Sequence, residues 1–148
     1  MIVTRETDYA LRILRALEEG RSMTAGELAE EEELPQKFAY KILKKLHKAG
    51  YIRIRRGASG GCSLNCRLEE VSLYDLLNAL DMNFLLSACM MSGYSCEWCR
   101  KKERSCTAHE QLSGIQKVID AELRKKNLRT ILFGAEERQT DEKTDREA

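Results

Sequence analysis

The chain has 148 residues, of which 43% are hydrophobic, 33% charged and 6% aromatic, with Pro35 as its single proline. This length suits one small domain with an appendage, and the composition favours helices over a β-sandwich. No apolar run approaches the roughly 20 residues of a membrane-spanning helix, and early charges at Arg5, Glu6 and Asp8 argue against a secretory signal. We therefore expect a cytoplasmic protein with no membrane partner, whose six cysteines serve as metal ligands or redox groups rather than disulfides.

Three amphipathic helices are predicted before residue 50. The first has apolar residues at helical spacing, and the second opens with the capping-box pattern Thr24 to Glu27. The third begins at Pro35 and runs to about Ala49. The apolar stripe of the first helix consists of Ala10, Ile13, Leu14 and Leu17, and that of the third consists of Phe38, Ile42, Leu43 and Leu46.

Positive charge is concentrated on the third helix and just after it. Between Leu34 and Gly61 there are eight cations and no acidic residue, although the whole chain has a formal net charge of only +1. The eight are Lys37, Lys41, Lys44, Lys45, Lys48, Arg53, Arg55 and Arg56. Such a segment predicts a surface for a polyanion, the alternative being an ordinary solvated helix.

A β-hairpin and a fourth helix are predicted next. Ile52 and Ile54 alternate with arginines, residues 57–61 form a glycine-rich turn, and the return strand follows. Ser72 and Asp75 then open a leucine-rich helix. The predicted fold class is mainly α with a small β-hairpin, in which residues 1–82 form a winged helix-turn-helix DNA-binding domain.

The remaining chain divides into three predicted segments. Residues 83–108 form a cysteine-rich sensor loop, residues 109–133 a long helix, and residues 134–148 a disordered polar tail. The apolar stripe of the long helix consists of Leu112, Ile115, Val118, Ile119 and Leu123. A helix this long on so small a domain needs a second surface to cover its stripe, so we expect a homodimer through residues 109–130. The alternative is that the helix packs back on its own domain.

The predicted DNA contacts lie on the third helix and the hairpin, which is the wing of such a domain. Glutamine reads adenine and lysine reads guanine in the major groove, whereas arginines beside a glycine turn suit the minor groove. Lys44, Lys45 and Lys48 are expected to meet phosphate or solvent, and Thr7 and Tyr9 are weaker candidates for phosphate. The predicted contacts to double-stranded DNA are Gln36, Lys37, Tyr40, Lys41, Lys44, Arg55, Arg56, Ser59 and Gly60.

The ordered set of motifs resembles the Rrf2-type (IscR/NsrR-like) winged-helix regulators over roughly residues 1–130. The resemblance rests on the opening residues 4–14, on 34–38 and 42–46, on 48–52, on the wing 56–61 and on 71–73. It implies a homodimeric transcription regulator with the long helix as its dimer element. Where the family usually has an aromatic residue after the glycine pair of the wing, this chain has Cys62.

The same resemblance implies an iron–sulfur cluster, [2Fe-2S] or [4Fe-4S], in the cysteine-rich loop. Family members with a cluster use three cysteines before the dimer helix, and some add a histidine after the last one. Cys89 and Cys106 match the outer positions, either Cys96 or Cys99 matches the middle one, and His109 matches the histidine. The spacing differs from the familiar versions, and one cysteine is extra.

Two other interpretations of this loop come from the residues themselves. Cys96-x2-Cys99-x6-Cys106-x2-His109 has plausible spacing for tetrahedral zinc, and a metal-free thiol switch is the third possibility. Cys62 and Cys66 are expected to act as small apolar residues of the wing.

The function expected from this sequence is a DNA-binding transcriptional repressor that senses iron–sulfur, redox or nitric-oxide status. The alternative is a zinc-stabilised or thiol-switch winged-helix module, without a cluster, that binds DNA or another protein. No catalytic triad, phosphate loop or carboxylate pair is apparent, so we do not expect an enzyme.

Overall fold

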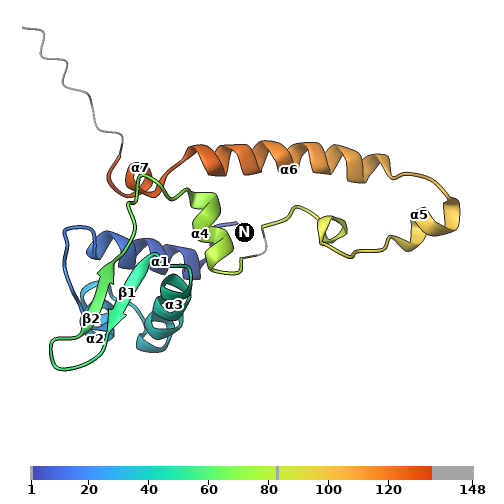
Figure 1. Cartoon of the computed structure of the whole chain (residues 1–148). Coiled ribbons are helices and arrows are strands. Elements are labelled where there is room, and N and C mark those ends of the chain that lie inside the picture. Colours follow the sequence, from blue (N-terminus) through green and yellow to red (C-terminus); the bar gives the residue numbers. More distant parts are fainter. Residues whose placement is uncertain (1, 83, 135–148) are drawn as a thin grey trace, which may run out of the picture.

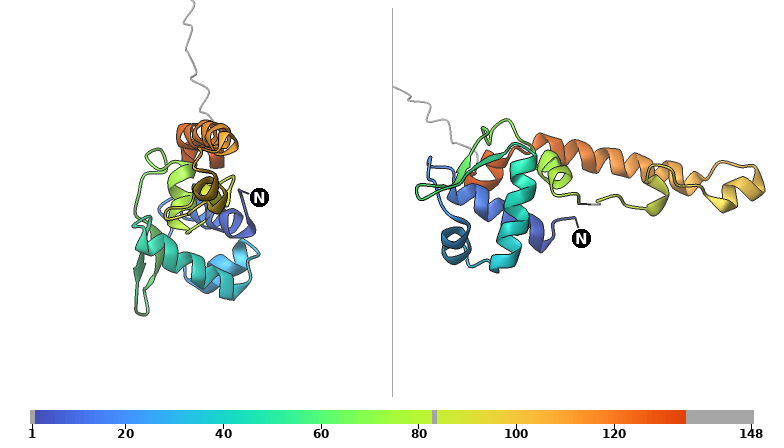
Figure 2. Two further views of the ribbon diagram at one scale, coloured as in Figure 1. Left: turned by 90° about the vertical axis from the view of Figure 1, so that its right-hand side faces the viewer. Right: turned by 60° about the horizontal axis from the view of Figure 1, so that its bottom comes forward.

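The computed structural model describes residues 2–82 and 84–134. Of the tail predicted to be disordered, residues 134–148, only Gly134 is among them. A winged-helix unit occupies one end of the molecule and a long arm projects from it (Figures 1 and 2). The elements of the winged-helix unit are α1 (Arg5–Ala16), α2 (Ala25–Glu31), α3 (Gln36–Lys48), β1 (Ile52–Arg55), β2 (Gly61–Leu64) and α4 (Leu73–Ala79). Those that follow are the short 3₁₀ helix η1 (Ala88–Met90), α5 (Glu97–Lys102), α6 (Thr107–Lys125) and α7 (Leu128–Phe133). This arrangement confirms the predicted fold class.

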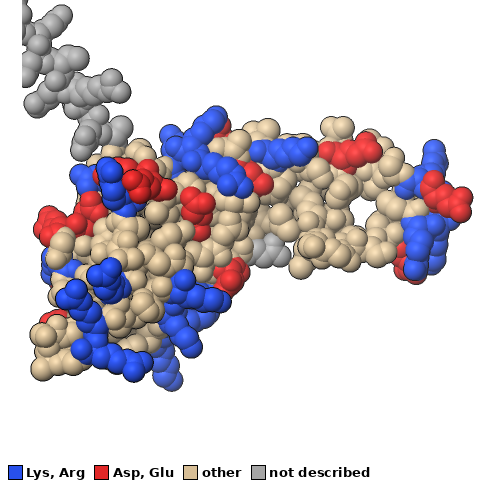
Figure 3. Space-filling view, in the orientation of Figure 1, with Lys and Arg blue, Asp and Glu red and all other residues tan. Residues whose placement is uncertain are grey.

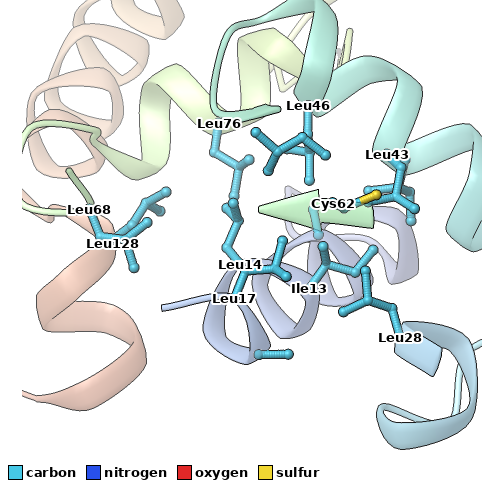
Figure 4. Close-up of a cluster of buried hydrophobic side chains, with 14 of the residues drawn as sticks. Ile13, Leu14, Leu17, Leu28, Leu43, Leu46, Cys62, Leu68, Leu76 and Leu128 are labelled. Atoms are coloured by element: carbon cyan, nitrogen blue, oxygen red, sulfur yellow. The ribbon is translucent and has the colours of Figure 1, made fainter. Parts of the chain in front are cut away.

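The core of the winged-helix unit is an aliphatic cluster between α1, α3, α4 and the hairpin (Figure 4). The predicted stripe of α1 is fully buried there. Both predicted capping boxes are present: the side chain of Thr24 accepts the Glu27 N–H at the start of α2, and Ser72 accepts the Asp75 N–H at the start of α4. Local sequence signals therefore set the beginnings of two helices that position the core.

The apolar stripe of α3 differs from the prediction at one position. Ile42, Leu43 and Leu46 are buried as expected, but Phe38 is 46% exposed and its place inside is taken by Ala39. The Phe38 ring lies edge-on to Tyr9 at 6.1 Å between ring centroids. Adjacent positions of a helix point in different directions, so only one of these two side chains can face the core, and here it is the smaller Ala39.

The hairpin is antiparallel, with Ile52 opposite Leu64 and Arg55 opposite Gly61. Cys62 is buried and pairs through its backbone with Met23, which attaches the hairpin to the segment before α2. The wing turn requires glycine at Gly60, because a Cβ atom there would lie 2.4 Å from the Arg55 carbonyl oxygen. Cys62 thus acts as a small core residue, as predicted.

The arm consists of an outgoing limb with η1 and α5 and a returning limb, α6 (Figure 1). Gln116 joins the limbs: its buried side chain accepts the Leu86 N–H at 2.8 Å and donates to Asp120 at 2.8 Å. Ile115 and Val118 of the predicted stripe are 51% and 63% exposed, whereas the other three positions are half-buried. Much of the stripe is therefore uncovered in the single chain.

The predicted long helix ends earlier than expected, because α6 stops at Lys125 rather than near Arg129. The Asn127 side chain accepts the Thr130 N–H at 2.8 Å and starts a separate helix, α7. Backbone hydrogen bonds tie this break to the segment before α4, and the side chain of Leu128 is fully buried in the core. The end of the arm is thus anchored in the winged-helix unit (Figure 4).

Within the described residues, none of the helices combines the length and the apolar character that crossing a membrane requires.

Candidate nucleic-acid interface and cysteine pocket

The predicted DNA contacts of α3 lie on its outer face. Gln36 and Lys37 occupy its first turn, Tyr40 and Lys41 the next, and Lys44 the turn after that, and all five side chains are exposed. Their spacing places them on one side of the helix because i, i+3 and i+4 positions are neighbours. The core packing of α3 therefore presents this face to solvent at the surface of the molecule.

A cleft of about 660 Å³ separates α3 from the hairpin. Five of the predicted contacts line it, namely Tyr40, Lys44, Arg55, Arg56 and Gly60. Ser59 is exposed in the wing turn and does not line the cleft, nor do Gln36, Lys37 and Lys41. Lysines and arginines gather over this part of the molecule (Figure 3). In the described part of the chain, neither Lys44 nor Arg55 nor Arg56 forms an ion pair, so these cations are available to phosphates.

His47, which the sequence suggested as a surface or backbone contact rather than a metal ligand, also lines the cleft. Its Nδ1 lies 3.1 Å from the carbonyl oxygen of Ile52 and therefore donates a hydrogen bond to it. The contact joins the end of α3 to the first strand of the wing. The available signal was its position three residues after Lys44, on the same face of the helix.

Lys41 and Lys45 differ from the other cations because both contact Glu6 on α1. The Lys41 Nζ lies 3.2 Å and the Lys45 Nζ 2.8 Å from the Glu6 carboxylate oxygens. Burial opposes ionisation of Glu6, but hydrogen bonds from Lys45 and Lys41 outweigh it and lower the pKa of this carboxyl. Lys45 is mostly buried, so the prediction that it faces phosphate or solvent is wrong.

Of the two weaker candidates on α1, Thr7 is fully buried and therefore unable to reach a phosphate, which corrects that prediction. Tyr9 is partly exposed beside Phe38. Neither residue lines the cleft between α3 and the hairpin.

The five predicted metal ligands line one pocket of about 310 Å³, to which η1, α5 and the start of α6 contribute. Besides Cys89, Cys96, Cys99, Cys106 and His109, it is lined by Tyr94, Ser105 and Glu110. The polypeptide doubles back through α5, so residues on both limbs reach the same space. Trp98 is 51% exposed and does not line the pocket, whereas Cys62 and Cys66 lie in the winged-helix unit.

The polar side chains of this pocket form two hydrogen-bonded groups. On one side, the Sγ of Cys89 lies 3.1 Å from the Nδ1 of His109, whose Nε2 lies 3.4 Å from the Ser113 hydroxyl. On the other side, Cys99 contacts both Cys96 and Cys106. Hydrogen bonds from the backbone and thiol of Cys99 lower the pKa of Cys96, and the bond with Cys96 raises the pKa of Cys99 to about 11.

The pocket supplies thiol and imidazole donors, which fit an iron–sulfur cluster or zinc in chemistry. Among residues 2–82 and 84–134, no three such side chains are already placed to coordinate one metal ion. The donors therefore converge on one space, and coordination requires their side chains to rotate into it.

Comparison with known proteins places nearly all of the described chain in one family. The sequence model of the Rrf2 family, described as iron-dependent transcriptional regulators, matches residues 3–133. The chain is 30% identical over 125 residues to the HTH-type transcriptional regulator NsrR of Geobacillus kaustophilus, covering 82% of this chain and 85% of that protein. Alignments to two other curated relatives cover 62% and 47% of those proteins.

Solved structures with the same fold include Staphylococcus aureus CymR, with a TM-score of 0.62 and 23% identity over 88% of this chain and 97% of that one. T. potens IscR has a TM-score of 0.63 and 20% identity over 93% of this chain and 90% of that one. The similarity to CymR and IscR concerns the fold, whereas the family model matches the sequence itself over nearly all the described residues. The chain belongs to the Rrf2 family of transcriptional regulators.

Proposed function

We propose that the protein is a homodimeric, sequence-specific DNA-binding repressor whose affinity for DNA depends on the state of its cysteine pocket. The observation that carries the DNA-binding part is the cleft between α3 and the wing, lined by Lys44, Arg55 and Arg56. In a winged helix-turn-helix protein, the recognition helix enters the major groove while cations flanking it neutralise phosphates. Gln36 and Lys37, in the first turn of α3, are then placed to read base edges.

The exposed stripe of α6 supports a homodimer through residues 109–130. Ile115 and Val118 leave an uncovered apolar face on this 19-residue helix, and a second copy would cover it. Two-fold symmetry then brings two recognition helices to half-sites about 34–36 Å apart, or a multiple of that distance.

Lys44→Ala is expected to weaken binding to all duplexes by a similar factor. Lys44 lines the cleft and is a candidate phosphate contact, so its loss should lower the slope of log affinity against log salt by about 1 per contact. The measurement is a fluorescence titration at several salt concentrations, with exposed Lys117→Ala on α6 as the matched control. An unchanged salt slope for Lys44→Ala would remove Lys44 from the interface.

Gln36→Ala is expected to relax base preference at one position of each half-site by about 1–3 kcal/mol. The amide of Gln36 is exposed in the first turn of α3, where it is suited to bidentate pairing with adenine. Titration of all single-base variants of the site would measure the effect. If the variant protein kept the wild-type preference, another residue would have to read that base.

For the sensor, we propose an iron–sulfur cluster in the 310 Å³ pocket. Cys89, Cys106 and His109, together with Cys96 or Cys99, would hold it. When bound, such a cluster supplies one-electron redox chemistry and reactivity toward oxidants and nitric oxide. Helix α6 sets the spacing of two of these donors: Cys106 is the residue at its N-terminal boundary, and His109 lies one turn further along the same helix. The family description as iron-dependent regulators supports this proposal.

Anaerobic purification followed by absorption spectroscopy and iron, sulfide and zinc analysis tests the sensor. A coloured protein with iron matched by sulfide is the expected result. A colourless protein with one zinc per chain would contradict the cluster and favour a structural zinc site at Cys96, Cys99, Cys106 and His109.

A thiol switch without metal is the second candidate, because Cys99 contacts both Cys96 and Cys106. It predicts colourless, metal-free protein that cannot be reconstituted with iron and sulfide, and in which mild oxidation joins two of these cysteines. Mass spectrometry of the oxidised protein would identify the pair.

A further inference from the structure

The ammonium group of Lys45 on α3 is surrounded by acceptors from two other parts of the fold. Its Nζ lies 2.8 Å from Glu6 Oε1 on α1 and 2.5 Å from the carbonyl oxygen of Leu80, at the end of α4. Asp81, the next residue, places a carboxylate oxygen 3.8 Å away. The Leu80 carbonyl accepts a hydrogen bond from the ammonium group, Glu6 forms a close ion pair with it, and Asp81, beyond hydrogen-bond distance, adds only a more distant negative charge.

Lys45 is unlike its neighbours on the same helix in exposure. Its side chain is 21% exposed, whereas Lys44 and Lys48 are exposed at the surface. It holds the C-terminal carbonyl of α4, where a positive charge is favourable because the helix dipole is negative at that end. This hydrogen bond joins two residues that are 35 positions apart in the sequence.

The residues that Lys45 holds are the ones from which the arm departs. Leu80 is fully buried, and Asp81 then turns the chain with a φ of +55°. Hydrogen bonds of 3.0 Å from the Asp81 N–H to Asn78 and from the Met82 N–H to Leu77 close the end of α4. Lys45 thus joins the recognition helix to the base of the arm. The same helix, α4, contacts the arm through Tyr74, whose ring lies edge-on to Phe84 and against the guanidinium group of Arg124 on α6.

We propose that Lys45 is a positioning residue that couples the state of the cysteine arm to the orientation of α3. The inference rests on the proposed function, of which it names the means of regulation. A displacement of the arm base would withdraw the Leu80 carbonyl from Lys45, and Glu6 on α1 would then compete for the ammonium group. Since Lys44 is the adjacent residue of α3, the same displacement changes how the DNA-reading face is presented.

Coupling between two sites is reciprocal, so bound DNA must alter the arm if the arm alters DNA binding. This permits a test that needs no metal. Reduced, metal-free protein is treated with N-ethylmaleimide, with and without a saturating duplex selected from random sequence by the wild-type protein. Mass spectrometry then gives the alkylation rates of the four pocket cysteines, and we expect bound duplex to change them by about fivefold or more.

Lys45→Met is the decisive variant and Lys44→Met its matched control, since each removes one ammonium group from adjacent positions of α3. We expect Lys45→Met to bind the duplex while its alkylation rates no longer depend on DNA. Lys44→Met should bind more weakly but, once saturated, show the full wild-type dependence. In Lys45→Met the Glu6 carboxylate keeps only Lys41 as its ion-pair partner. If this single variant does not fold, the double variant Lys45→Met with Glu6→Gln, which also removes the carboxylate, replaces it in the test.

A wild-type dependence on DNA that persists in Lys45→Met would overturn the inference. Alkylation rates that ignore bound duplex in the wild-type protein would also overturn it, while leaving DNA binding intact. Wild-type protein that selects no duplex would instead contradict the proposed function itself, together with the inference that rests on it.

Discussion

The Cys106→Ser protein, purified without oxygen, is expected to retain about one tenth or less of the wild-type iron. Cys106 lines the arm pocket, contacts Cys99 and lies three residues before His109. A neutral serine hydroxyl is a poor substitute for thiolate as a ligand of iron in a cluster. Iron and sulfide analysis of matched preparations would give the ratio, and the visible absorption should fall with it.

The matched control is Cys66→Ser, because Cys66 lies outside the pocket. It is half-buried beside the core of the winged-helix unit, where burial and nearby Glu18 raise the pKa of its thiol to about 11. A buried neutral thiol of this kind is not expected to ligate metal, so this variant should keep its iron. Wild-type iron in Cys106→Ser, or equal losses in both variants, would contradict the assignment of the pocket.

Leu128→Ala is expected to lower the free energy of unfolding by about 2–5 kcal/mol. Leu128 is the first residue of α7, and its side chain is fully buried against Leu68 in the core (Figure 4). Truncation removes buried apolar contacts and leaves a cavity that the surrounding helices fill only partly. Urea unfolding followed by circular dichroism would measure the change.

Leu86→Ala makes the same chemical change at an exposed position of the arm and serves as the control. We expect it to alter the free energy of unfolding by less than about 0.5 kcal/mol. Similar values for both variants would show that α7 does not anchor the arm in the core as the structure indicates.

The parts of the fold that local chemistry determines could be predicted from the sequence. The stripe of α1, the capping boxes at Thr24 and Ser72 and the hairpin depend on residues close together in the chain. Residues that line the cleft between α3 and the hairpin, such as Lys44 and Arg55, could be predicted for the same reason. Helical spacing and strand alternation determine which side chains face outward.

The rest depends on contacts between distant residues. Phe38 fits the apolar periodicity of α3, but in the folded chain it lies outside against Tyr9 of α1 while Ala39 is buried. Lys45 is indistinguishable from Lys44 in sequence, and only the positions of Glu6 and Leu80 separate their roles. The break between α6 and α7 had a local signal, the capping residue Asn127, which the continuous periodicity obscured.

The cysteine pocket could be predicted from the sequence only in part. The family resemblance and the sequence spacing suggested its donors, but not that Cys89 pairs with His109, 20 residues away, while Cys99 contacts Cys96 and Cys106. This grouping depends on the fold of the arm, in which α5 reverses the chain so that the two limbs meet. Spacing alone therefore could not choose between Cys96 and Cys99.

Hydroxyl-radical footprinting tests the central claim most directly, using the duplex that the wild-type protein selects from random sequence. A symmetric dimer with one recognition helix per protomer should protect two equivalent stretches whose centres lie about 34–36 Å apart, or a multiple of that distance. A single unsymmetric stretch, or no protection at all, would contradict a dimeric DNA-binding regulator.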